Sequence, residues 1–262
     1  MNLKQLINKS IYGTVGYIAS QDDIDILESY IVYNLPILKE FKHIVVATNY
    51  GSTFQSQNTQ LWKKYFPDCT LIDSKINRGH SFGTADLDDL IFDYCKENNI
   101  KWLCKSANDI ILQEEILNKE IPEADFYYLN GIGYGGMIKY NFDFNIIIKE
   151  DFYPQTNFYF INVSKTDYLN DKKHIDEIYN IVQSIPNYNN KAWEYGFKSC
   201  EGLLNECVLR NNLLKHHLIS LEKYISLLRV VKDYQIHDCS HKNIMIEGIC
   251  HFQHPDNQII EI

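Results

Sequence analysis

Short apolar runs that end in polar residues alternate with amphipathic stretches along the first half of the chain. The runs have the length of strands, and we expect strands at 14–20, 43–48, 69–73, 101–105 and 126–129. Helical spacing between them predicts helices at 22–41 and 53–66, and a third that carries Leu87, Leu90, Ile91 and Tyr94 on one side. This alternation predicts an α/β fold, with a mainly parallel central sheet and helices on both faces.

The second half of the chain has a different pattern. Glycine clusters and alternating aromatic residues at 131–164 predict loops and antiparallel strands. Helical spacing returns later, and we expect helices at 167–182, 200–214 and 218–231. Because no Pro/Gly/Ser-rich linker occurs, we expect one domain over 1–262, with a ligand-binding half at 1–130 and a second half at 131–262 that ends in a helical tail.

Composition narrows the class of protein. The 262 residues carry a formal net charge of −9, which argues against a broad nucleic-acid-binding surface. No apolar run is long enough to span a membrane, and the N-terminal residues lack the apolar core of a signal peptide. Seven cysteines without a CxxC pair are typical of reduced thiols, so we expect a cytoplasmic protein.

The stretch Lys101–Gln113 places polar residues at the end of a predicted strand. An apolar run gives way to Lys105, Asn108 and Asp109, and a second apolar run follows. Ligands of open α/β sheets bind outside the carboxyl ends of the strands, where a carboxylate suits a divalent cation that holds a diphosphate. The alternative is that Asp109 caps the next helix or closes a turn.

A glycine-bearing loop, Asn77–Gly83, precedes the third predicted helix. Glycine lets the backbone approach a ligand closely, and a helix N-terminus favours phosphate. Asn77, Arg78 and Gly79 are therefore candidate phosphate-binding residues, with Arg78 paired to a diphosphate oxygen. The strict GxGxxG pattern is absent, which argues against an NAD-binding domain.

The segment Lys105–Ile111, KSANDII, is similar to the K-T-D-D-D-V-F pattern of the fringe and β-1,3-galactosyltransferase group. The order of the elements around it resembles the GT-A glycosyltransferases. This resemblance implies a Rossmann-like sheet that binds a nucleotide-sugar, and a DxD metal site. Only the last carboxylate, Asp109, is kept here, because Ala107 and Asn108 occupy the other two places. The incomplete motif implies a weak Mn²⁺ or Mg²⁺ site, or an enzyme that needs no metal. In either case the charge of the leaving diphosphate must be neutralised, by Asp109 with a cation or by Arg78 and Lys105 directly.

A second segment, Asp151–Ser164, is similar to the Y-P-x-Y-x-x-G-x-x-Y-x-x-S stretch on the acceptor side of the same group. Tyr153, Pro154 and Ser164 match, whereas Asn157 falls in the glycine region. In that position, aromatic rings offer apolar faces to a sugar. The alternative is an aromatic-rich strand in the core.

The resemblance also implies roles farther along the chain. Glu201 best matches the acid that acts as general base in inverting members, and Glu194 and Glu206 are competing candidates. The alternative for Glu201 is a first-turn glutamate favoured by the helix dipole. Many GT-A enzymes bring a C-terminal histidine to the metal, so His251 and His254 are candidate metal ligands, with a solvated tail as the alternative.

In the resembled fold, the end of the first strand faces the nucleotide base and ribose. Ser20 and Asp22 follow that strand, and either Asp22 or Asp23 has the chemistry to accept hydrogen bonds from ribose hydroxyls. Helix capping explains the same residues equally well.

These features predict a glycosyltransferase that moves a sugar from a nucleotide-diphosphate donor, foremost a UDP-sugar, to an acceptor hydroxyl. The reaction inverts the anomeric centre if Glu201 is the base. One alternative is a degenerate domain that binds a glycan or a partner without turnover. Another is a sugar nucleotidyltransferase, which is disfavoured because no glycine- and basic-rich loop follows the first strand.

Overall fold

The computed structural model describes residues 1–49, 54–108, 110–130, 154–167, 169, 172–184, 216–220, 243–246, 249–251 and 259–261. The helices are α1 (Leu3–Ile7), α2 (Gln21–Leu38), α3 (Gln55–Tyr65), α4 (His80–Glu97) and α5 (Lys172–Gln183), with 3₁₀ helices η1 (Glu114–Asn118) and η2 (Val163–Lys165). Among these described residues, no helix combines the length and the apolar character that crossing a bilayer requires.

The main sheet has seven strands in the order β3-β2-β1-β4-β7-β6-β8. Its members are β1 (Ser10–Gly16), β2 (Ile44–Asn49), β3 (Thr70–Ser74), β4 (Trp102–Ala107), β6 (Phe126–Asn130), β7 (Pro154–Asn162) and β8 (His216–Ser220). Neighbouring strands are parallel except where β7 pairs with β4 and with β6, so β7 alone runs against the others. The predicted α/β class with a mainly parallel sheet is confirmed.

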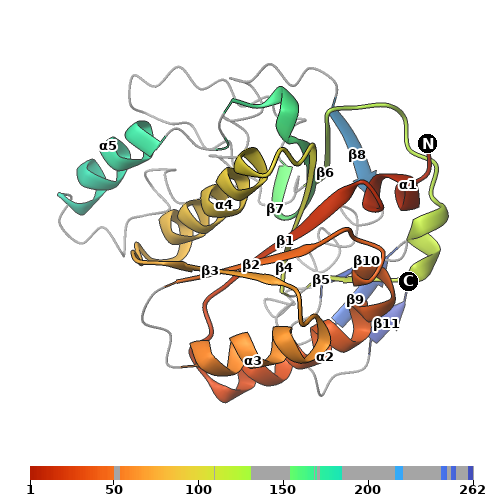
Figure 1. Ribbon diagram of the computed structural model, residues 1–262, viewed down its shortest axis with the longest axis horizontal. Helices are drawn as coiled ribbons and strands as arrows, with labels where there is room; N and C mark the ends of the chain where they lie inside the picture. Colours follow the sequence, from red (N-terminus) through yellow and green to blue (C-terminus); the bar gives the residue numbers. More distant parts are fainter. Residues whose placement is uncertain are drawn as a thin grey trace, which may run out of the picture.

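A smaller sheet combines the end of the chain with its middle. Its order is β11-β9-β10-β5, made of β5 (Ile110–Leu112), β9 (Asn243–Ile246), β10 (Ile249–His251) and β11 (Ile259–Glu261). The connection to the first half is β5, which follows β4 after only two residues. Through β10, which pairs with β5, a late segment of the chain therefore lies beside the strand that follows β4 (Figure 1).

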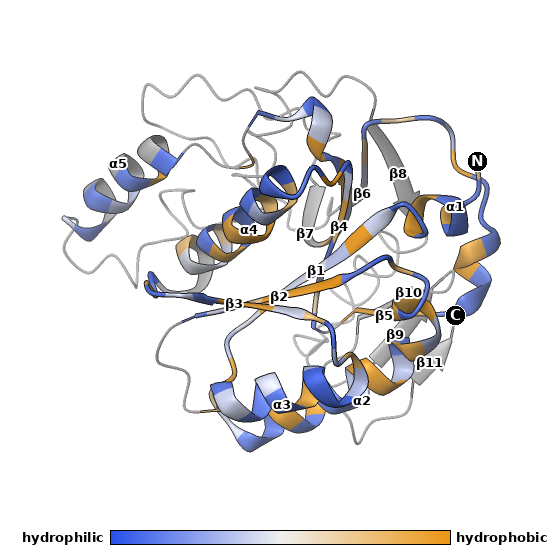
Figure 2. Cartoon of the chain, in the orientation of Figure 1, coloured by the Kyte–Doolittle hydropathy of each residue, from blue (hydrophilic) through white to orange (hydrophobic). Residues whose placement is uncertain are grey.

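The helices form layers on the two faces of the main sheet, with α4 on one face and α2 and α3 on the other (Figure 1). Side chains alternate along the strands: on β2, Val45 and Ala47 pack with α4, whereas Ile44 and Val46 pack with α2 and α3. Figure 2 shows apolar residues on the sheet-facing sides of these helices. Burial on both faces explains why these strands read as nearly continuous apolar runs.

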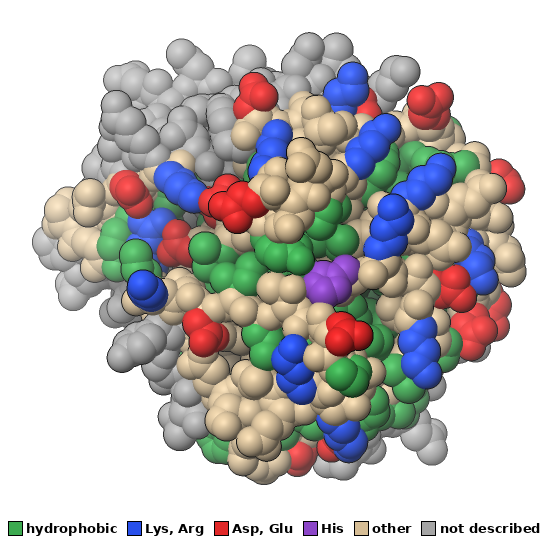
Figure 3. All heavy atoms as spheres, in the orientation of Figure 1, with side chains coloured by type: hydrophobic (Ala, Val, Ile, Leu, Met, Phe, Trp, Pro, Cys, Tyr) green, Lys and Arg blue, Asp and Glu red, His purple; other side chains and the backbone are tan. Residues whose placement is uncertain are grey.

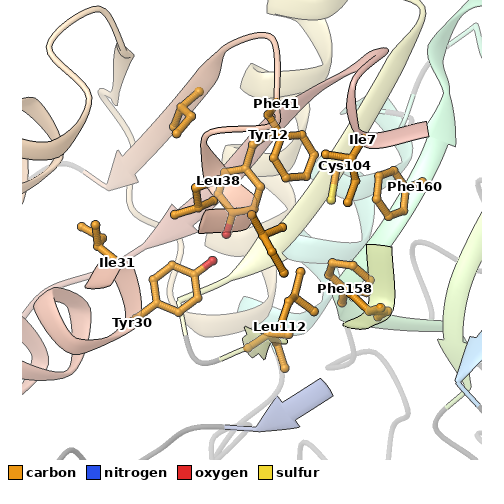
Figure 4. Packing of buried hydrophobic residues seen from close by; sticks show 14 of the residues in the cluster. Ile7, Tyr12, Tyr30, Ile31, Leu38, Phe41, Cys104, Leu112, Phe158 and Phe160 are labelled. Carbon is orange, nitrogen blue, oxygen red and sulfur yellow. The ribbon is translucent and has the colours of Figure 1, made fainter. Parts of the chain in front are cut away.

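The core on the α2 side draws on segments that are distant in sequence. Tyr12 of β1, Tyr30 of α2, Leu112 of β5 and Phe158 of β7 belong to one buried cluster (Figure 4). Phe158 and Phe160 meet edge to face, with ring centroids 5.6 Å apart. The aromatic residues at 158–161 are fully buried, so this part of the predicted acceptor segment is a core strand.

Two expectations about the ends of elements are corrected. The first strand was expected at 14–20, but β1 spans Ser10–Gly16. Ser10 is buried at its start because its hydroxyl donates to the Leu6 carbonyl, 2.7 Å away. Gly13 lies within it, where a Cβ would come 2.7 Å from Ile91. Because Ser10 and Gly13 interrupt the apolar pattern, the sequence did not reveal that the strand begins at Ser10.

The predicted helical tail is also wrong where the structure describes it. Residues 218–220 belong to β8, and His216 and His217 lie on this strand and not on a helix. The described segments after β8 are the strands β9, β10 and β11. The helix expected at 22–41 is α2, which continues through Pro36 and ends at Leu38, three residues before its expected end. The predicted helix at 200–214 lies outside the described residues.

Candidate functional site

The carboxyl ends of β1 and β4 meet at the point where the chain reverses its direction of travel across the sheet. From β1 the chain moves to β2 and β3, and it then returns through α4 to β4 on the other side of β1. In open α/β sheets, the crevice outside such a switch point is where ligands bind. The candidate residues are therefore judged by their position relative to this edge.

A hydrogen bond ties the two strands together at this edge. Thr14 of β1 donates from Oγ1 to Oδ1 of Asn108, which directly follows β4, over 2.6 Å. A Cβ on Gly16 would overlap the Asn108 amide, so the glycine leaves the room that this side chain occupies. Asn108 is thus held against β1 at the switch point. This is the position expected of a residue that contacts a bound ligand.

The next residue, Asp109, lies outside the described residues, but its surroundings are defined. Asn108 precedes it and β5 begins directly after it. In the pairing of β5 with β10, His251 stands opposite Ile110. Directly opposed residues of antiparallel strands have Cα atoms about 4.5 to 5.5 Å apart. His251 therefore lies opposite the residue that directly follows Asp109 in the chain.

Metal binding is testable only on the described part of this site. Among the described residues, no three His, Cys, Asp or Glu side chains lie close enough together to hold a metal ion. Asp109 and His254 are outside those residues, and His251 is described by its backbone alone. A carboxylate and an imidazole are ligand types that a cation can combine with phosphate oxygens and water.

The residues after β1 cap the following helix. Ser20 is the N-cap of α2, and its hydroxyl accepts from the Asp23 backbone N–H over 3.2 Å. In return, Asp23 Oδ2 accepts from the backbone N–H groups of Ala19 and Ser20, each over 2.9 Å. This capping box engages Ser20 and Asp23. Asp22, in the first turn, is exposed and remains the candidate for a ribose contact.

The loop before α4 contains a glycine whose backbone conformation would let a ligand come close to the main chain. Gly79 is the N-cap of α4 with φ +84°, which a residue with a Cβ rarely adopts, and no atom lies within 4 Å of where its Cβ would be. Asn77 Oδ1 accepts from the Gly79 N–H over 3.0 Å and fixes the turn. Asn77 and Gly79 are both exposed, so the turn is open to solvent before the helix begins.

Arg78 of the same loop is already paired with carboxylates. Its guanidinium grips Asp86 through Nε and Nη2 and donates from Nη1 to Asp176 of α5 over 2.6 Å. It also lies 5.1 Å from the ring centroid of Tyr179. The hydrogen bonds to Asp86 raise the pKa of Arg78 above its ordinary value. Arg78 thus joins the start of α4 to α5, and a phosphate would have to displace Asp176.

Lys105 is buried below the edge. Its side chain on β4 is 2% exposed, and Nζ lies 3.7 Å from Oδ1 of Asp88 on α4. Asp88 and the neighbouring Asp89 are each 4% exposed. Lys105 therefore helps to hold α4 on the sheet, and its ammonium group is buried beside Asp88.

Several predicted residues fall where the structure gives no description. Glu201, its rivals Glu194 and Glu206, and Tyr153 of the acceptor segment all lie outside the described residues. Their roles stay predictions. Pro154 begins β7, and Ser164 in η2 is exposed and donates to Asn162 Oδ1 over 2.7 Å.

The sequence reasoning missed polar residues on the strands themselves. Thr14 was read as part of an apolar run, yet it holds Asn108. At the carboxyl ends of β2 and β3, Thr48 donates to Asp73 Oδ1 over 2.9 Å, and Gln55 of α3 donates to the same carboxylate. Thr48 and Asp73 are the last residues of the strands predicted at 43–48 and 69–73, and this was the signal available for them. Thr14 began its predicted strand and gave no such signal.

Comparison with protein-family models found no match for this chain, and comparison with curated proteins found none either. The function of the protein is therefore inferred from the geometry above and from the motifs in its sequence.

Proposed function

We propose that this chain is a GT-A-like glycosyltransferase. The donor is a nucleotide-diphosphate sugar, foremost a UDP-sugar, and the acceptor is a hydroxyl group of a glycan or another molecule. The donor diphosphate binds outside the carboxyl ends of β1 and β4, beside Asn108 and Asp109. Asp22 follows β1, and the exposed turn at Asn77 and Gly79 follows β3, which β2 separates from β1. Because these strands are parallel, both segments leave the sheet at its carboxyl edge.

One observation carries this proposal: the Thr14–Asn108 hydrogen bond at the switch point. It fixes the residue that precedes Asp109 at the edge where ligands of such sheets bind. The motif that suggested a sugar donor and the topology that favours a ligand site are independent arguments. Both lead to the same pair of residues.

Charge at the leaving group decides how the site would work. Departure of the sugar leaves negative charge on the diphosphate, and groups that neutralise this charge lower the barrier. Arg78 and Lys105 are engaged by Asp86, Asp176 and Asp88. A Mn²⁺ or Mg²⁺ ion held by Asp109, with His251 or His254, would supply the missing positive charge. Asn108 would orient the diphosphate through its amide.

Glu201 is the proposed general base, which takes the proton from the acceptor hydroxyl as the new glycosidic bond forms. A direct displacement of this kind inverts the anomeric centre. The test is UDP release from UDP-sugars with Mn²⁺ and with EDTA. We expect turnover with Mn²⁺ that EDTA abolishes. In Glu201→Gln turnover falls by about 100-fold or more while UDP binding is unchanged.

Glu194→Gln and Glu206→Gln are the matched variants, and each should keep its turnover. If one of them, and not Glu201→Gln, loses turnover, the base is that glutamate. Absence of UDP release from every UDP-, GDP- and dTDP-sugar tried would contradict the proposed activity.

A binding domain without turnover is the second candidate. The observation that favours it is the pairing of Arg78 and Lys105 with carboxylates, because both cations predicted for the diphosphate serve the packing of α4. Such a domain would bind a glycan or a nucleotide-sugar and release no UDP in the same assay.

A further inference from the structure

An asparagine in the middle of α2 makes the same contacts with β5 that a neighbouring strand would make. Asn34 is 1% exposed. Its Nδ2 donates to the Ile110 carbonyl over 3.1 Å, and its Oδ1 accepts from the Leu112 N–H over 2.8 Å. The carboxamide thus offers one donor and one acceptor to β5, as a backbone peptide group does.

Asn34 supplies hydrogen-bond partners to buried polar groups on the edge of β5 that faces no other strand. In the small sheet, β5 is the last strand and pairs with β10 on its other edge. The Ile110 carbonyl and the Leu112 N–H point toward α2, where Ile110 and Leu112 are almost completely buried. A buried strand edge must be paired or covered, and here a side chain does so.

The same amide is anchored on its own helix. Nδ2 also donates to the Tyr30 carbonyl over 3.0 Å, one turn earlier in α2. Tyr30 and Leu112 lie in the same buried cluster (Figure 4). The position of the Asn34 amide is therefore fixed from both sides, and it holds β5 at a defined distance from α2.

We infer that Asn34 is a positioning residue for the proposed donor site. Asp109 lies between two fixed points: Asn108, which Thr14 holds, and Ile110, which Asn34 holds. The strand that Asn34 holds also pairs with the strand that carries His251. Asn34 touches no donor atom, and it acts by fixing the backbone on the far side of Asp109. This inference rests on the proposed function.

The test compares Asn34→Leu with Asn58→Leu. Asn58 is a buried asparagine, 2% exposed, on α3, so its loss removes a buried amide from a helix other than the one that holds β5. Binding of Mn²⁺ in the presence of UDP is measured by the loss of the free Mn²⁺ signal in electron paramagnetic resonance. We expect Asn34→Leu to weaken binding about tenfold or more, the usual effect of removing an outer support of a metal site. Asn58→Leu should stay within about twofold of the wild type, because it leaves that outer support in place.

Hydrogen exchange of the Leu112 N–H is a second measurement, independent of any ligand. It should be faster in Asn34→Leu and unchanged in Asn58→Leu, since only the first variant removes its acceptor. Unchanged exchange in Asn34→Leu would overturn the inference. Equal Mn²⁺–UDP binding in the two variants, with the wild type binding, would also overturn it. A wild type that binds no Mn²⁺ with UDP would instead refute the proposed function.

Asn34→Asp keeps the test valid if Asn34→Leu does not fold. A protonated carboxyl can both donate to Ile110 and accept from Leu112, whereas an ionised one can only accept. Burial raises the pKa of such a carboxyl, so protonation begins well above the pH range of a free aspartate. We expect Asn34→Asp to bind Mn²⁺–UDP weakly at about pH 8 and to approach the wild type as the pH falls toward about 6. A constant ratio to the wild type over this range would overturn the inference.

Discussion

Two regions beside the carboxyl edge of the sheet use their polar residues in opposite ways. Around α4, charged residues neutralise one another: Arg78 pairs with Asp86 and Asp176, and Lys105 pairs with Asp88. At the ends of β1 and β4, neutral groups meet instead, as Thr14 holds the Asn108 amide. Arg78 and Lys105, the two cations predicted to bind a diphosphate, thus pair with acids that hold α4 in place. The neutral pair of Thr14 and Asn108 instead lies at the proposed site.

This difference has a consequence for the proposed chemistry. If Arg78 and Lys105 stay in their ion pairs, the charge of a donor diphosphate must be balanced by a cation at Asp109. The contrast between the two regions therefore predicts metal dependence. Figure 3 shows that positive and negative side chains are both spread over the face in view.

The largest effect on stability should come from the buried ion pair. Lys105→Met leaves the nearly buried carboxylate of Asp88 without this ammonium group, and we expect the free energy of unfolding to fall by about 3 kcal/mol or more. Urea denaturation measures this loss. The folded fraction should keep its affinity for UDP with Mn²⁺, since Nζ faces α4. Loss of UDP affinity without a loss of stability would place Lys105 in the site and break the comparison.

A smaller effect is expected at Arg78, whose side chain is 13% exposed. Arg78→Gln should cost about 2 kcal/mol because it removes charge-assisted hydrogen bonds to Asp86. Asp176→Asn should cost less than about 1 kcal/mol, as Asp176 is 61% exposed and solvent screens its pairing. Thermal unfolding ranks the two variants. A tenfold loss of UDP affinity in Arg78→Gln would show instead that the guanidinium leaves Asp176 for phosphate.

A modest change in stability tests the other side of the comparison, the neutral pair at the ends of β1 and β4. Thr14→Val removes one hydrogen bond to Asn108 and should cost about 1 kcal/mol. It should also weaken Mn²⁺–UDP binding several-fold, because Asn108 is no longer held at the edge.

Thr70→Val is the matched control for Thr14→Val. Thr70 lies at the amino end of β3, where its hydroxyl contacts His43 Nε2 over 2.8 Å and donates to the Tyr94 hydroxyl over 3.3 Å. It should cost similar stability and leave UDP binding unchanged. Equal UDP affinities in the two variants would mean that the Thr14–Asn108 contact has no part in ligand binding.

The sequence predicted the layers of the fold well, because burial on both sheet faces leaves long apolar runs between amphipathic helices. It predicted the position of β1 poorly. Ser10 and Gly13 are unfavourable in an apolar pattern, and only the tertiary contacts with Leu6 and Ile91 explain their burial. Residues 218–220 fit helical spacing locally, but pairing with β6 makes them a strand.

For the candidate site, the sequence predicted which polar residues lie near the carboxyl edge better than it predicted which contacts they make. Asn108 was correctly expected at the end of a strand, whereas Lys105 of the same polar stretch lies within β4. The helix-capping alternative for Ser20 is what the structure contains. No local pattern could show that Arg78 and Lys105 meet acids on α4 and α5, since these contacts depend on how helices pack across the sheet. The support that Asn34 gives to β5 spans 76 and 78 residues and was equally hidden.

The most direct test of the proposed donor site is the thermal shift that UDP produces with Mn²⁺ and with EDTA, in the wild type and in Asp109→Ala. Asp68→Ala, an exposed aspartate just before the amino end of β3, is the control. A ligand at about 100 times its dissociation constant stabilises a protein by about 2.7 kcal/mol. With Mn²⁺, we predict that UDP raises the unfolding temperature of the wild type and of Asp68→Ala. EDTA or the Asp109→Ala substitution should abolish this rise. An equal shift in Asp109→Ala and the wild type would contradict the site proposed here.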